Sequence, residues 1–268
     1  MKPILAATDF SPIGNQAVVR ACELAAASGA PLILLHVLDE PEQAEAARSA
    51  LQALAAGLGI DASLRLASGP VREVLQDQAD ACDAGLLVLG ARERSLVEGL
   101  LLGSTAERMA EHCRRPLLIV RQSASLPYRR LLVPVDFSTR SAQAIALARQ
   151  LLPQAGMTLL HTFELPFEGR LRHAGLGDGE LASLLEQALQ QAGVQMQAFA
   201  ASQQLEGLGV RSLILHGDPV SHTLAQAQPE QHDLLLVGRR SQGLLAELLL
   251  GSVTRNLLQH AAIDTLVF

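Results

Sequence analysis

The sequence predicts an α/β protein made of two similar domains, each an open five-stranded parallel sheet with helices on both faces, as in Rossmann-like folds. Three observations support this prediction: the chain repeats itself, apolar runs alternate with helical patterns, and 49% of its 268 residues are hydrophobic. That amount of apolar material is sufficient for the cores of two ordinary domains.

The internal repeat sets the domain organisation. The stretch "ILAATDFSP" (residues 4–12) returns as "LLVPVDFST" (residues 131–139), and Gly90 and Gly103 return as Gly238 and Gly251. A constant spacing over a long block indicates duplication of one unit. We therefore expect a first domain over residues 1–122 and a second over 128–268.

The spacing between the copies is larger toward the C-terminus, so the second copy contains an insertion at about residues 164–195. This segment is Gly-rich at first and then helical in pattern. Two interpretations are open: it covers a pocket or forms a partner surface, or it is a loop with an extra helix packed on the sheet edge.

The elements of the first copy follow in order. Residues 3–9 form a short apolar run ending in polar residues, which is typical of a buried strand, and residues 13–27 have helical spacing that Ser28-Gly29 ends. A second apolar run at 30–37 precedes an Ala- and Glu-rich helix at 41–58. Residues 60–67 alternate weakly as a third strand, and a helix runs from the Gly69-Pro70 turn to about residue 79.

The remaining elements are a strand at 84–90, a helix at 104–113 and a strand at 116–120. Strands separated by helices of this length favour a parallel sheet, and right-handed connections make it doubly wound. Ligands of such sheets bind at the carboxyl ends of the strands, so residues at those ends are the candidates for a site.

Asp9 and Asp136 follow the first strand of each copy. A carboxylate there can accept hydrogen bonds from a ligand, or it can close a turn and cap the next helix. Gly90 and Gly238 end the fourth strands, where a missing side chain lets a ligand approach the backbone.

Two Gly-Ser pairs, Gly103-Ser104 and Gly251-Ser252, then open a helix. Free N–H groups, the helix dipole and a hydroxyl make such a position an anion site, although serine is also a common N-cap.

The paired "DFS" starts, the "LLHV" second strand, the "GxP" turn and the loops ending in "LLLGS" resemble the universal stress protein family over essentially the whole chain. The segment "ELPFEGRLRHAG" (residues 164–175) resembles the insertion of its tandem members. The resemblance implies the strand order 3-2-1-4-5 in each sheet. It also implies association through the fifth strands, here Leu117–Val120 and Thr265–Phe268, within one chain, with further dimerisation open.

The ATP-binding branch of this family carries a sequence motif in which two residues separate a first from a second Gly. Nine further residues then precede a third Gly, which is followed by Ser or Thr. The resemblance places Asp136, Thr162, Gly238, Ser241, Gly251, Ser252 and Val253 around ATP or ADP in the second copy, and Asp9, Val37, Gly90, Gly103, Ser104 and Thr105 in the first. Both copies lack the middle glycine. Glu93 in the first copy repels a polyphosphate by about 3 kcal/mol at about 5 Å, whereas Ser241 is neutral. We expect the second copy to be the nucleotide site.

Composition excludes several other classes. A net charge of -6 argues against a nucleic-acid binder, and no apolar run is long enough to cross a membrane. Three scattered cysteines and an N-terminus without a secretory pattern favour the cytoplasm. His216 and His222 flank a turn and are a weak candidate for a pair of metal ligands. His112 and His260 are expected at helix C-termini, where an imidazole interacts favourably with the helix dipole.

We find no signature of catalysis such as a Walker lysine loop or a nucleophile elbow. The leading hypothesis is an ATP- or ADP-binding stress-response module. The alternatives are a nucleotide-independent interaction protein with degenerate pockets and, less favoured, a weak ATPase.

Overall fold

The computed structural model describes residues 1–38, 40–91, 102–121, 127–165, 177–205, 209–239 and 250–268. In the first half of the chain the elements are β1 (Ile4–Ala7), α1 (Pro12–Ser28), β2 (Leu32–Leu38), a 3-10 turn at Pro41–Gln43, α2 (Ala44–Leu58), β3 (Ser63–Ser68), α3 (Val71–Ala81), β4 (Leu86–Gly90), α4 (Ser104–His112) and β5 (Leu117–Val120). In the second half they are β6 (Arg130–Pro134), α5 (Thr139–Leu151), β7 (Gly156–Phe163), α7 (Asp178–Ser202), β8 (Val210–His216), α8 (Pro219–Gln226), β9 (Leu234–Val237), α9 (Ser252–His260) and β10 (Asp264–Val267).

The strands form one continuous sheet in the order β3-β2-β1-β4-β5-β10-β9-β6-β7-β8. Each half is parallel and has the expected order 3-2-1-4-5, and the halves join through antiparallel pairing of β5 with β10. In this pairing Leu266 faces Leu118, Thr265 faces Ile119 and Val267 faces Leu117. The register is therefore symmetric about the two central leucines.

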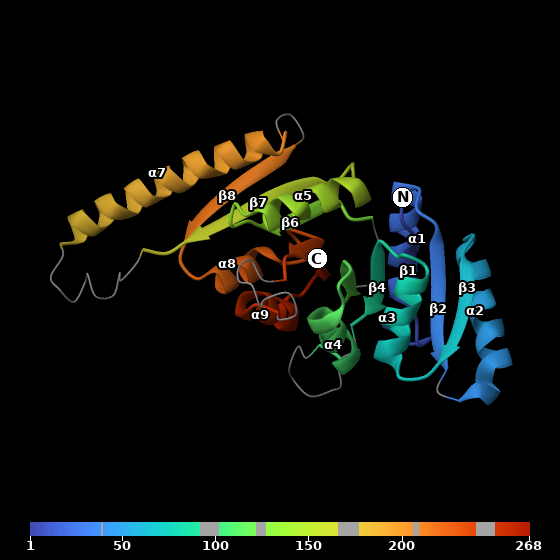
Figure 1. Cartoon of the computed structure of the whole chain (residues 1–268). Coiled ribbons are helices and arrows are strands. Elements are labelled where there is room, and N and C mark those ends of the chain that lie inside the picture. The colour runs from blue at the N-terminus through green and yellow to red at the C-terminus, as the bar shows by residue number, and fades with distance from the viewer. Residues whose placement is uncertain (39, 92–101, 122–126, 166–176, 206–208, 240–249) are drawn as a thin grey trace.

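Helices cover both faces of this sheet (Figure 1). On one face α1, α2, α5 and α7 pack over a core that includes Val18, Leu51, Ala144 and Met196. On the other face α3, α4, α8 and α9 pack over residues such as Leu75 and Leu257. Each core draws residues from both halves of the chain, so the halves share their apolar interior.

The turn from the first strand into the first helix has the same design in both halves. Ser11 and Ser138 are the N-caps, and their hydroxyls accept hydrogen bonds from the backbone N–H groups of Gly14 and Ser141. The residue before each cap, Phe10 or Phe137, has a positive φ of 62°. A bulky residue in this conformation is strained, and such strain concentrates at binding sites.

The added residues of the second half belong partly to α7. This helix lies between β7 and β8 in the chain and packs on both strands, as α2 does on β2 and β3. It has 25 residues where α2 has 15, and it lies with β8 at the end of the sheet opposite α2 and β3 in Figure 1. The helical pattern in the insertion is therefore the lengthened counterpart of α2. Residues 166–176 lie outside the described parts.

A buried polar cluster holds the seam between the halves. Asp264, which is fully buried at the start of β10, accepts hydrogen bonds from Arg20 Nε on α1 (3.2 Å) and from the Tyr128 hydroxyl (2.5 Å). Its other oxygen accepts from the backbone N–H of Arg121 at 2.6 Å. Burial is the main reason why the pKa of Tyr128 lies well above its usual value, so this hydroxyl remains a donor.

Within the described ranges, none of the helices combines the length and the apolar content needed to cross a bilayer.

Candidate functional site

Each half has a cavity at the carboxyl ends of its strands. The second-half pocket, of about 450 Å³, is lined by six of the residues expected there: Asp136, Thr162, Gly238, Gly251, Ser252 and Val253. The first-half pocket, of about 430 Å³, is lined by all six of its candidates: Asp9, Val37, Gly90, Gly103, Ser104 and Thr105. The fold thus brings together residues that are more than a hundred positions apart in the sequence.

The expectation that the second copy is the nucleotide site depends on Ser241 and Glu93, and both residues lie outside the described residues. The same holds for Arg92, Arg94 and Arg240 beside them. The comparison of the two pockets therefore depends on the walls formed by the strand ends and the helix N-termini.

The carboxylates after the first strands are held by the turns that follow them. Asp9 accepts hydrogen bonds from the backbone N–H and the hydroxyl of Ser11, at 3.0 and 2.5 Å. Asp136 accepts from the backbone N–H of Ser138 at 3.1 Å and from the Ser141 hydroxyl at 2.7 Å. Both carboxylates close a turn and also line a pocket, so the two interpretations of these residues are compatible.

The charge of Asp136 is stabilised by these bonds. Partial burial acts to raise the pKa of this carboxyl, but the hydrogen bonds from Ser138 and Ser141 outweigh burial and hold the pKa below its usual value. Asp136 is therefore ionised in the pocket at neutral pH, where it can accept a hydrogen bond from a ligand amine or hydroxyl.

Replacing Ser141 with alanine is expected to raise the pKa of Asp136, because the carboxylate loses a donor at 2.7 Å. A depressed carboxyl pKa stabilises the fold above the unfolded value of about 3.9. That stabilisation is lost as the pH falls through the folded pKa, so in the variant it should be smaller and its loss should be complete at a higher pH. NMR titration of the Asp136 carboxyl measures the change, and an unchanged pKa would contradict this account.

The strand-ending glycines differ between the halves. A Cβ added to Gly90 would lie 2.9 Å from the carbonyl carbon and oxygen of Ile13, so the first turn of α1 packs directly on the end of β4. A Cβ added to Gly238 would meet only the ring of Phe268, at 3.5 Å, among the residues that the structure describes. The end of β9 is therefore not covered by α5.

The residues of the first helical turn explain this difference. Gly14 on α1 is replaced by Ser141 on α5, and Ile13 is replaced by Arg140. Gly14 has no room for a Cβ, which would lie 2.4 Å from the Asp9 carboxylate. A serine at this position needs space for its side chain, which is consistent with the absence of α5 atoms within 4 Å of a Cβ on Gly238 among the described residues.

The Gly-Ser pairs lie at the helix starts as expected, but their roles differ from the N-cap interpretation. Gly103 and Gly251 are the N-caps, with extended backbones, and Ser104 and Ser252 are the first helical residues. The N-cap assignment of these serines is therefore wrong. Because glycine has no side chain, neither cap offers an oxygen to the free N–H groups, which leaves these donors available to an anion.

Two arginines line the second pocket, whereas the described lining of the first pocket contains no arginine or lysine. Arg140 is on the first turn of α5, and Arg239 follows Gly238. The Arg239 side chain crosses to the first half, where its Nε donates to the Ala110 carbonyl at 3.2 Å and its Nη2 to the Arg115 carbonyl at 2.8 Å. Burial, and to a smaller extent the charge of Arg140, lowers its pKa.

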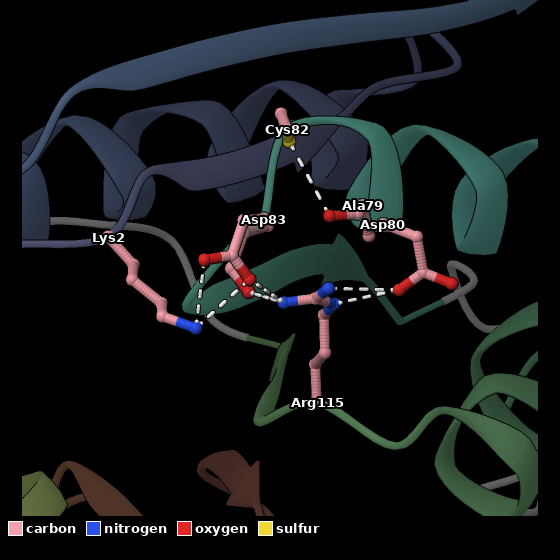
Figure 2. Close-up of polar contacts among 7 residues, drawn as sticks. Lys2, Ala79, Asp80, Cys82, Asp83 and Arg115 are labelled. Carbon is pink, nitrogen blue, oxygen red and sulfur yellow. Dashed lines mark hydrogen bonds and ion pairs between the residues drawn. The ribbon is translucent and has the colours of Figure 1, made fainter.

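The segment that receives Arg239 is itself firmly held. Figure 2 shows the Arg115 guanidinium between Asp80 and Asp83, with Lys2 on the other side of Asp83. The ion pairs measure 2.9 Å to Asp80, 3.2 Å to Asp83 and 2.9 Å from Lys2 to Asp83. The Arg115 carbonyl is therefore a positioned acceptor for the Arg239 side chain, and Arg239 in turn lines the second pocket.

Two histidines, His36 and His161, also line the pockets and were not predicted as site residues. The Nδ1 of each bonds a carbonyl after the first strand, Thr8 at 2.8 Å and Val135 at 2.9 Å. A carbonyl only accepts, so Nδ1 carries the proton and Nε2 of the neutral ring is an acceptor. The repeated "LLH" was the available signal.

The metal interpretation of His216 and His222 receives no geometric support. His222 Nε2 lies 2.9 Å from the His216 carbonyl oxygen, so one of its two ring nitrogens is already occupied. In the part of the chain that the structure describes, no group of three or more His, Cys, Asp or Glu residues could hold a metal ion. His112 and His260 are the last residues of α4 and α9, as predicted.

Known proteins with similar sequences are matched over short stretches. Universal stress protein E of Escherichia coli K12 is 34% identical over 73 residues, which cover 27% of this chain and 23% of that protein. A universal stress protein of Mycolicibacterium smegmatis is 47% identical over 49 residues, or 18% of this chain and 38% of that protein. The chain thus matches about a quarter of the length of its Escherichia coli relative.

Solved structures match over the full length, and the likeness concerns the fold. A protein of unknown function from Pseudomonas aeruginosa PAO1 has a TM-score of 0.77 at 16% identity, covering 100% of this chain and 92% of that one. A universal stress protein from Archaeoglobus fulgidus DSM 4304 has a TM-score of 0.70 at 19% identity, covering 99% and 97%. The model of the universal stress protein family matches residues 1–53, 38–121 and 127–268, and the chain belongs to this family.

Proposed function

We propose that the second half of the chain binds an adenine nucleotide, ATP or ADP, and that the protein acts as a nucleotide-responsive stress module. The observation that carries the proposal is the end of β9, which α5 leaves open. Among the described residues, no atom of α5 lies within 4 Å of the point where a Cβ on Gly238 would stand, whereas α1 covers the equivalent Gly90. A cavity of about 450 Å³ is in the usual range for small-molecule sites.

The chemistry of the lining supports the same proposal. The glycine-capped start of α9 offers free N–H groups for phosphate, and the ionised Asp136 and the His161 Nε2 are acceptors for amine or hydroxyl groups. Arg140 and Arg239 add positive charge on the wall of the pocket. The pocket therefore matches a ligand that has a phosphate end and a polar, largely uncharged end.

The first half favours the alternative, a protein-interaction role without nucleotide. Its described lining has one carboxylate, Asp9, and no cation, and α1 covers Gly90. Partners would use surfaces other than β5 and β10, because these two strands already pair with each other. A weak ATPase activity is the third and least favoured candidate.

Binding of ATP to the wild type and to two matched variants tests the proposal. Gly251→Asp places a carboxylate at the N-cap of α9, where aspartate suits the helix and competes with phosphate for the N–H groups. We expect at least a tenfold loss of affinity, by isothermal titration calorimetry. Gly103→Asp makes the same change at α4 and should leave binding unaltered.

The outcomes separate the candidates. Loss of binding in Gly103→Asp alone would show that the first pocket is the site. The absence of any ATP binding by the folded wild type would favour the interaction role, and ATP turnover that Gly251→Asp abolishes would favour the ATPase.

A further inference from the structure

Among the described residues, the opening between α5 and the end of β9 has no counterpart between α1 and β4. There, Ile13 and Gly14 of α1 contact Gly90 within 3.0 Å of where its Cβ would lie. In the second half, the described atoms within 4 Å of the same point on Gly238 belong to Phe268. Arg140 of α5 and Phe268 line the second pocket together with Gly238, so this pocket reaches the opening.

The second pocket carries two positively charged side chains. Arg140 and Arg239 both line the pocket, and they are close enough for the charge of Arg140 to act on Arg239. Among the residues that the structure describes, neither arginine forms an ion pair with a carboxylate. Arg239 has five N–H donors, of which two bond the carbonyls of Ala110 and Arg115.

The position of Arg140 is unfavourable unless an anion is present. It lies in the first turn of α5, at the positive end of the helix dipole, where a cation is destabilising. It also lies near a second guanidinium in a partly buried wall. The nearby carboxylate, Asp136, is already bonded by Ser138 and Ser141. Both arginines therefore have unused capacity for a negatively charged ligand.

We propose that Arg140 and Arg239 form a phosphate subsite in this opening, and that Arg140 makes the second pocket select ligands carrying a phosphate group over the corresponding nucleoside. Guanidinium groups bind phosphate oxygens through two parallel N–H donors, which gives geometric selectivity as well as charge. The nucleotide class of the ligand rests on the proposed function, whereas the phosphate subsite stands on the arginines alone.

Arg140→Met is the informative variant, because it keeps most of the aliphatic stem and removes the charge. Arg239 is less suitable, since its replacement would also remove bonds to the first half. The matched control is Arg149→Met, on the same helix, with the same change of charge. The Arg149 guanidinium donates to the Gln203 carbonyl at 3.3 Å, and Arg149 does not line the pocket.

Affinities for adenosine, AMP, ATP and pyrophosphate are measured by calorimetry for the wild type and both variants. We expect the wild type to bind AMP at least tenfold more tightly than adenosine. Arg140→Met should lose about tenfold for AMP and pyrophosphate and keep its adenosine affinity, and Arg149→Met should match the wild type. The loss should shrink at high salt, because screening weakens the contact in the wild type.

The results distinguish this proposal from the proposed function. Equal AMP affinities in Arg140→Met and the wild type would overturn the subsite while leaving a nucleotide site intact. Pyrophosphate binding that depends on Arg140, without binding of any adenine ligand, would support the subsite and overturn the nucleotide function. If the folded wild type binds none of the four ligands at millimolar concentration, both the subsite and the proposed nucleotide function are overturned.

Discussion

Replacing Asp264 with alanine is expected to lower the free energy of unfolding by about 3–5 kcal/mol, which is the usual cost of removing one member of a buried ion pair. Arg20 and Tyr128, both almost fully buried, would lose the carboxylate that they share, and the Arg121 N–H would lose its acceptor. Urea denaturation measures the change.

The control for this experiment is an exposed contact across the same seam. Arg255 on α9 pairs with Glu111 on α4 at 3.2 Å, and about half of the Arg255 side chain is exposed. Glu111→Ala should therefore cost less than about 1 kcal/mol. If Asp264→Ala were no more destabilising than Glu111→Ala, the polar cluster would not be what holds the two halves together.

Gly90→Ala is expected to destabilise the protein by about 1–3 kcal/mol, the usual cost of forcing extra volume into a packed region. The new methyl group would lie 2.9 Å from two backbone atoms of Ile13, and backbone cannot move aside as a flexible side chain can. The start of α1 would have to shift away from β4.

Gly238→Ala makes the same change at the equivalent strand end and should alter stability by less than about 0.5 kcal/mol. Its methyl group would lie 3.5 Å from the Phe268 ring, which is ordinary contact. Thermal or urea unfolding of the two variants side by side provides the comparison. Equal losses would mean that the end of β9 is as tightly covered as the end of β4, and the case for an open second pocket would fail.

The sequence predicts much of this architecture because its strongest signals are local. Apolar runs bounded by Gly, Ser and Pro place the strands to within a few residues; the third strand, expected at 60–67, is Ser63–Ser68. The repeat in turn predicts that Asp9 and Asp136 hold equivalent positions. The two turns match in cap and backbone angle, and each carboxylate accepts a hydrogen bond from the backbone N–H two residues on.

Contacts between the halves leave no such local signal. Nothing near Arg239 in the sequence indicates that its side chain bonds carbonyls at residues 110 and 115, more than a hundred positions away. The buried Asp264 is likewise inconspicuous at the start of an apolar strand. The different coverage of the two glycines depends on single substitutions in the following helix, whose effect is visible only once the packing is known.

The symmetric register of β5 against β10 has a consequence for how the two pockets can differ. Facing leucines at the centre of the pairing resemble the axis of a two-fold dimer. In a true homodimer, every substitution appears in both subunits, so both copies would have to carry the Asp264–Arg20 ion pair. A change that opens one pocket would likewise open the other. Covalent duplication removes that constraint: the chain keeps the geometry of a dimer while one copy retains Ile13 and Gly14 and the other carries Arg140 and Ser141.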